Sequence, residues 1–157
     1  MDILLALASL SGNTRQLAHI ISSNCRDAGH TVRWLETDIS PYALLHDLRL
    51  RGHKCYDLYL FGTWTDNVGK TPAEMKQFIV EFIDAVGKPP RVAVFGTGET
   101  QWGQEYYCGA VHRVAEIFSS EYPRLLIEQM PHGEKDAQTI SQWVDAVLAR
   151  ATQEISI

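Results

Sequence analysis

The chain has 157 residues, 45% of them hydrophobic, which suits one domain of common size with its own core and excludes a disordered chain. Its 19 acidic and 14 basic residues give a formal net charge of −5, which disfavours nucleic-acid binding because such proteins present a basic surface. Residues 1–8 lack the basic start of a signal peptide, and their apolar run is too short to cross a bilayer. We therefore expect a cytoplasmic protein, folded as a single domain over residues 1–157, that uses neither nucleic acid nor a membrane.

The cysteines and histidines form no recognisable chemical motif. Cys25, Cys55 and Cys108 include no CxxC pair, and the six histidines pair with no cysteine or acid at metal-ligand spacing. No Ser/His/Asp order is recognisable either. The sequence therefore predicts free thiols, no metal and no catalytic residues, with Cys108 as a small buried side chain.

The first half of the chain alternates strand-like and helical segments. The apolar run Ile3–Ala8 predicts a buried strand, and the apolar spacing after it predicts a helix over Asn13–Ala28. A second strand is expected at Thr31–Thr37, a short helix at Pro41–Leu50 and a third strand at Tyr56–Gly62.

The second half repeats this alternation. A helix is expected between Pro72 and Gly87, a strand at Arg91–Gly96, a helix at Glu105–Ser119, a strand at Leu125–Met130 and a helix at Glu134–Ala151. Five strands separated by helices predict a parallel sheet covered on both faces, which is the doubly wound, three-layer α/β/α architecture. Ligands of such folds bind at the carboxyl ends of the strands.

The loop after the first strand has the residues of an anion site. Gly12 allows a close backbone approach, and the unpaired N–H groups of the following helical turn point toward any anion placed there. Ser9, Ser11 and Thr14 add hydroxyl donors and Asn13 adds an amide, so a phosphate can be held without a lysine. Taken alone, the same residues are also those of an ordinary helix cap.

The pattern Ser/Thr-x-Ser/Thr-Gly-Asn-Thr directly after the first strand resembles the FMN phosphate loop of the flavodoxin family. The resemblance covers almost the whole chain, and the absence of a long insertion in the fifth strand makes it similar to the short-chain class. It implies a flavodoxin-like fold with strand order 2-1-3-4-5 and bound FMN. The phosphate contacts that it implies are Ser9, Leu10, Ser11, Gly12, Asn13 and Thr14.

The loop after the third strand, GTWTDNVGKTP over residues 62–72, is similar to the family's second flavin loop but departs from it in part. Asp66 replaces a stacking tryptophan, and Asn67 replaces the glycine whose peptide reorients when the flavin is reduced. Trp64 takes a tyrosine position and is the candidate for an aromatic wall. The flavin contacts implied here are Thr63, Trp64, Thr65, Asp66, Asn67, Val68 and Gly69.

The loop after the fourth strand carries the third part of the resemblance. Gly96, Gly98, Cys108 and Ala110 match the family pattern, and Glu99 stands for its aspartate. Trp102 is the first candidate for stacking on the flavin and Tyr106 the second. The contacts implied here are Thr97, Gly98, Glu99, Thr100, Trp102, Gly103 and Tyr106.

The resemblance implies a low-potential electron carrier that acts between a flavodoxin reductase and redox acceptor proteins, as a monomer in transient electrostatic complexes. An alternative is the flavodoxin-like activator of a manganese ribonucleotide reductase, because Trp102-Gly103 and Leu125-Leu126 are similar to that family's pattern. A flavin reductase would need a substrate pocket built by a dimer. A phospho-accepting receiver is disfavoured, since no carboxylate pair follows the first strand.

Overall fold

The computed structural model describes residues 1–37, 46–47, 50–51 and 55–157. Its centre is a five-stranded sheet in the order β2-β1-β3-β4-β5, with every neighbouring pair parallel. The strands are β1 (Asp2–Ala8), β2 (Thr31–Glu36), β3 (Leu58–Trp64), β4 (Val92–Gly98) and β5 (Leu125–Glu128). The α-helices are α1 (Asn13–Asp27), α3 (Ala73–Val86), α4 (Gly109–Ile117) and α5 (Gly133–Ser156). This confirms the expected doubly wound fold.

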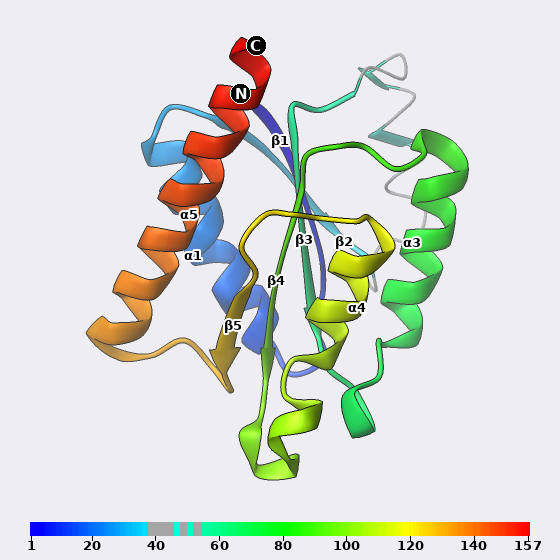
Figure 1. The fold of residues 1–157 in the computed structure, drawn as a ribbon, viewed down its shortest axis with the longest axis vertical. Helices are drawn as coiled ribbons and strands as arrows, with labels where there is room; N and C mark the ends of the chain where they lie inside the picture. The colour runs from blue at the N-terminus through cyan, green and yellow to red at the C-terminus, as the bar shows by residue number, and fades with distance from the viewer. Residues whose placement is uncertain (38–45, 48–49, 52–54) are drawn as a thin grey trace.

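Helices cover both faces of the sheet, and β1 shows why its sequence is apolar at every position. Ile3, Leu5 and Leu7 belong to one core, which also contains side chains of α1 and α5. Leu4 and Ala6 belong to the other core, with side chains of α3 and α4. Successive side chains of a strand point to opposite faces, so a strand buried on both faces is apolar throughout. Figure 1 shows α1 and α5 on one side of the sheet and α3 and α4 on the other.

Several element bounds differ from those expected. β3 and β4 run to Trp64 and Gly98, two residues further than predicted, because β3 and β4 pair with each other as far as Trp64 and Thr97. The predicted helix Glu105–Ser119 is wrong in its first turn: two 3₁₀ turns, η2 (Thr100–Trp102) and η3 (Gln104–Tyr106), precede α4. The left-handed backbone of Cys108, with φ 50°, separates η3 from α4.

The last two elements also depart from the prediction. β5 ends at Glu128, because Gln129 has a left-handed backbone with φ 54°. α5 continues five residues beyond the predicted end at Ala151, to Ser156. Most of the helix expected at Pro41–Leu50 lies outside the described residues. Among the described residues, no helix is both long enough and apolar enough to cross a membrane.

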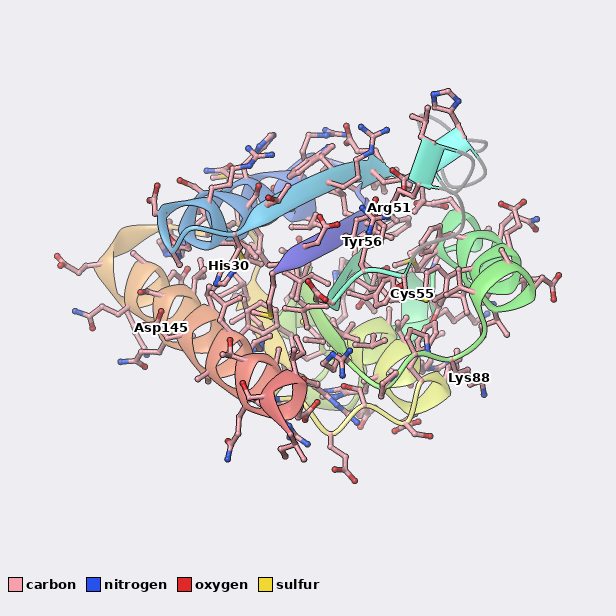
Figure 2. All side chains as sticks on the ribbon, turned by 90° about the horizontal axis from the view of Figure 1, so that it is seen from above. His30, Arg51, Cys55, Tyr56, Lys88 and Asp145 are labelled. Atoms are coloured by element: carbon pink, nitrogen blue, oxygen red, sulfur yellow. The ribbon has the colours of Figure 1, made fainter. Side chains whose placement is uncertain are left out.

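A polar cluster closes the end of the sheet where the strands begin. Tyr56 donates its hydroxyl to the buried carboxylate of Asp47 over 2.6 Å, and the guanidinium of Arg51 lies 3.7 Å from the Tyr56 ring centre. Arg51 also pairs with Asp2 at 2.6 Å. Figure 2 views the molecule from this end and shows Arg51 and Tyr56 side by side. These groups satisfy one another, so the cluster is structural.

Candidate functional site

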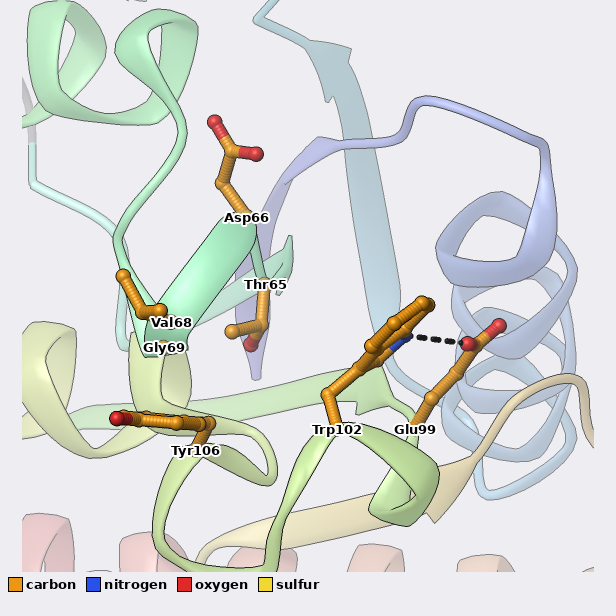
Figure 3. A pocket seen from close by; sticks show the side chains of 7 residues that line it. All are labelled: Thr65, Asp66, Val68, Gly69, Glu99, Trp102 and Tyr106. Carbon is orange, nitrogen blue, oxygen red and sulfur yellow. Dashed lines mark hydrogen bonds between the residues drawn. The ribbon is translucent and has the colours of Figure 1, made fainter.

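Two adjoining cavities lie at the carboxyl edge of the sheet, where β1, β3 and β4 end and their loops meet, at the bottom of Figure 1. Each has a volume of about 310 Å³. The α1-side cavity is lined by Leu10, Ser11, Asn13, Trp64, Thr65, Thr97, Gly98, Glu99, Trp102 and Gln129. The η1-side cavity, drawn in Figure 3, is lined by Thr65, Asp66, Val68, Gly69, Glu99, Trp102 and Tyr106. The two share Thr65, Glu99 and Trp102, so they form one continuous region.

The loop after β1 presents unpaired donors at the start of α1. Gly12 takes the cap position with φ 94° and, having no side chain, caps none of the first N–H groups. The hydroxyl of Ser9 accepts the N–H of Arg15 over 3.3 Å. Among the hydrogen bonds of the described residues, none uses the N–H groups of Asn13 and Thr14. Such a helix start is suited to an anion such as a phosphate.

A buried hydroxyl pair ties this loop to the middle of the sheet. Thr14 Oγ1 lies 2.9 Å from Thr97 Oγ1, and both side chains are buried. The pair fixes the first turn of α1 against the end of β4. The loop after β1 and the strand that precedes the third loop are therefore held in one geometry.

The loop after β3 turns sharply through η1 (Asn67–Gly69). Asp66 donates its N–H to the carbonyl of Lys70 over 2.8 Å, and Gly69 donates back to Asp66 over 3.1 Å. Val68 has a left-handed backbone with φ 52° and ψ 35°, which costs a β-branched residue about 1–2 kcal/mol. Its side chain nevertheless remains 52% exposed beside the cavity.

The loop after β4 holds Trp102 at the boundary between the two cavities. The indole N–H of Trp102 donates to Glu99 Oε2 over 2.9 Å, as Figure 3 shows, yet the side chain is 70% exposed. Glu128 at the end of β5 anchors this loop by accepting both the N–H and the hydroxyl of Thr100, over 3.0 and 3.1 Å. An apolar ring is therefore presented on a fixed support, with little protein covering it.

Backbone contact between two glycines joins η1 to α4. A Cβ on Gly109 would lie 2.6 Å from the carbonyl oxygen of Gly69, closer than real Cβ atoms approach. Thr65 reinforces this junction, because its hydroxyl accepts the N–H of Ala110 over 3.3 Å. The loops after β3 and β4 are thus packed against each other beside the η1-side cavity.

Most of the residues expected to hold the flavin are brought to this edge. Thirteen of the twenty line a cavity, while Ser9, Gly12, Thr14, Thr63, Thr100 and Gly103 line neither, and the side chain of Asn67 is outside what the structure describes. Thr63 is fully buried and donates its hydroxyl to the carbonyl of Trp64. Trp64 itself donates its indole N–H to Glu74 over 2.9 Å.

Gln129 lines the α1-side cavity although no motif pointed to it. It was expected inside the fifth strand, but it follows β5 with a left-handed backbone, and its N–H donates to the carbonyl of Gly98 over 2.7 Å. No sequence pattern marks a glutamine that reaches a site only because its strand is short.

The charged side chains that line the two cavities are acidic. Among the described lining residues there is no lysine or arginine, and the two acids are Asp66 and Glu99. Burial raises the pKa of the neighbouring Cys108 thiol to about 12, which keeps it protonated, and its burial confirms the expected packing role. The described residues also include no group of three potential metal ligands.

FMN fits this set of residues. Uncapped N–H groups at the start of α1 suit its phosphate, and the exposed indole of Trp102 beside an open cavity suits its ring.

Comparisons with known proteins agree on one family. Residues 5–143 match the family model described as "Flavodoxin". The chain is 33% identical over 147 residues to "Probable flavodoxin 2" of Bacillus subtilis, covering 88% of this chain and 89% of the relative. Its fold is similar to that of oxidised flavodoxin 2 from Bacillus cereus, with TM-score 0.73, 28% identity and coverage of 96% and 99%. A Fusobacterium nucleatum flavodoxin bound to flavin mononucleotide shares the fold alone, with TM-score 0.69, 11% identity and coverage of 95% and 98%.

Proposed function

Because this chain belongs to the short-chain flavodoxin family, and is thus an FMN-binding electron-transfer protein, we propose that it carries electrons from a cytoplasmic reductase to acceptor enzymes. The observation that carries the proposal is the sheet edge at which three loops surround the two adjoining cavities, with an exposed tryptophan between them. An electron carrier needs one exposed edge of its flavin and no substrate pocket besides.

We assign the parts of FMN to the two cavities as follows. The phosphate is held by the loop Ser9–Thr14 through the backbone N–H groups and the side chains of Ser11 and Asn13. The flavin ring occupies the η1-side cavity, with Trp102 and Tyr106 as its aromatic neighbours. Bound FMN supplies one-electron redox chemistry, and the protein residues set its orientation and its access to water.

The acidic side chains of the cavity favour a low potential. Asp66 and Glu99 line the η1-side cavity, and a negative charge close by disfavours further negative charge on a bound group. The formal charge of −5 also favours transient docking to a basic partner surface. Both features support a low-potential carrier that docks transiently with its redox partners.

A coupled assay tests the proposed transfer. The chain is loaded with FMN and mixed with NADPH, an NADPH-dependent flavodoxin reductase and cytochrome c as the terminal acceptor. Reduction of cytochrome c is expected to depend on the FMN-loaded chain and to slow with added salt, because oppositely charged surfaces dock less readily when screened. Direct oxidation of NADPH by the loaded chain without the reductase would contradict a pure carrier.

The alternative role as activator of a manganese ribonucleotide reductase finds no support in the relatives described above, which are all named flavodoxins. Redox titration separates the two roles. Two widely spaced one-electron potentials are expected for a carrier, whereas close potentials with oxidant production in air would favour the activator.

A further inference from the structure

Arg15 places a cation where an α-helix favours an anion. It lies in the first turn of α1, which contains no acidic residue. The unpaired N–H groups there carry partial positive charge, so a guanidinium at this position is repelled unless an anion lies close by. A residue that breaks a local rule of helix design is expected at a functional or strained site.

The side chain of Arg15 is folded back toward the phosphate loop. Its Nη1 lies 3.8 Å from the position that a Cβ on Gly12 would occupy. Glu36 holds it there, because Arg15 Nε donates to Glu36 Oε1 over 2.5 Å. Glu36 ends β2 beside Leu7 of β1, so the register of the sheet brings this carboxylate to the same edge.

The guanidinium keeps donors available for a second anion. Within the part of the chain that the structure describes, Glu36 is the hydrogen-bond partner of the Arg15 side chain, and it uses only Nε. None of the described residues pairs with the two terminal nitrogens of the guanidinium, and the side chain is 34% exposed. Glu36 carries one negative charge and so neutralises Arg15. A flavin phosphate at this place would add a further charge of about −1.5 to −2, with which the guanidinium can also interact.

We propose that Arg15 makes the loop Ser9–Thr14 select the phosphorylated flavin, FMN, over riboflavin, with Glu36 as the residue that positions it. This inference rests on FMN binding by that loop, as proposed above. The charge around the site works against a dianion: the formal charge of the whole chain, Arg15 included, is −5, and the described cavity linings contain two acids and no base. A nearby arginine offsets that repulsion and acts on the phosphate without touching the ring.

The test compares FMN with riboflavin, which lacks only the phosphate. Each flavin is titrated with the apoprotein of the parent, Arg15→Gln, Arg15→Lys and Arg26→Gln chains, and binding is followed by quenching of flavin fluorescence. Arg15→Gln is expected to weaken FMN binding about three- to tenfold and to leave riboflavin binding within about twofold of the parent. Arg15→Lys keeps the charge and should restore part of the loss.

Arg26→Gln is the matched control. Arg26 is exposed in the last turn of the same helix, 11 residues from Arg15, which is about 16 Å along the axis and about two Debye lengths at physiological salt. It removes the same charge from the molecule, and FMN affinity should not change. A comparable loss in both variants would show that net charge, and not Arg15, is responsible.

Three results would overturn the inference. One is FMN affinity that Arg15→Gln leaves unchanged, and another is an equal loss for FMN and riboflavin, which would indicate a structural role. The third result comes from the parent chain, and it serves if Arg15→Gln fails to fold. Sodium chloride should weaken FMN binding to the parent and leave riboflavin binding unchanged. An equal salt dependence for the two flavins would contradict the proposal. Failure of the parent to bind FMN would instead overturn the FMN site itself.

Discussion

Trp102 combines a position held by a hydrogen bond with a largely uncovered ring. The hydrogen bond to Glu99 holds the indole, while 70% of the side chain stays exposed. A flavin packed against this ring would cover the apolar surface, and an aromatic pair adds about 0.5–1.5 kcal/mol beyond burial. We expect Trp102→Leu to weaken FMN binding about three- to tenfold, as measured by fluorescence titration.

Trp34→Leu is the control for this substitution. Trp34 in β2 stacks on His19 of α1 with ring centres 4.3 Å apart, and it lines neither cavity. Its replacement removes the same type of ring but should leave FMN affinity unchanged. If both variants bound FMN equally well, Trp102 would have no part in holding the ring.

The junction between η1 and α4 depends on the absence of one side chain. Since a Cβ on Gly109 would meet the Gly69 carbonyl at 2.6 Å, Gly109→Ala must push the two elements apart. We expect the free energy of unfolding to fall by about 1–3 kcal/mol, and FMN affinity to fall with it, because Gly69 lines the η1-side cavity. Urea unfolding and flavin titration measure the two effects.

Gly29→Ala separates the two effects. Gly29 follows α1 at φ 92° with open space around it, so alanine there strains the backbone but displaces nothing near the site. The variant should lose stability and keep its FMN affinity. An affinity loss of similar size in both variants would mean that general destabilisation, and not the junction, weakens binding.

Elements with a strong apolar pattern could be predicted from the sequence, and the loops between them could not. The β1 run and the α1 spacing gave bounds within one residue, because each is decided by burial of its own side chains. The helix expected from Glu105 begins only at Gly109, because Gly103 and Cys108 adopt positive φ, which the apolar spacing does not reveal.

The candidate site shows the same division. Leu10, Ser11 and Asn13 could be assigned to this edge from the sequence, because the motif lies within one loop, and they line the α1-side cavity. Glu128 and Gln129 could not, because they reach the site only through pairing of β5 with β4 and through the contacts of Thr100 and Gly98. Arg15 was visible in the sequence, but only the fold reveals that Glu36 turns it toward Gly12.

At the scale of the whole molecule, the reactivity of the three thiols distinguishes the folded chain from the unfolded one. Cys25 and Cys108 are buried in opposite cores, and burial raises the pKa of Cys25 to about 11 and that of Cys108 to about 12, whereas Cys55 is exposed. We expect a disulfide reagent at neutral pH to modify Cys55 alone in the native protein and all three thiols after unfolding. Rapid reaction of two or more native thiols would contradict the described cores.

The burial of these two thiols makes the free energy of unfolding depend on pH. Above the ordinary thiol pKa of 9.0, the unfolded chain loses protons from Cys25 and Cys108 that the folded chain keeps. Unfolding therefore releases protons, and the free energy of unfolding should fall as the pH rises from about 9 toward 11, by at most about 1.4 kcal/mol per pH unit for each thiol. Cys25→Ala should make this decline shallower in urea titrations.

The hydroxyl pair between Thr14 and Thr97 bears on how fast the protein is degraded in a cell. It couples α1, which packs in one core, to β4, whose side chains enter both, at the edge of the sheet that carries the candidate site. A ligand that binds only the folded chain shifts the folding equilibrium by an amount that grows with its concentration over its dissociation constant. FMN binding would therefore stabilise both cores against unfolding. The chain's resistance to cellular proteases would then depend on the supply of FMN, and protein made in excess of FMN would be degraded first.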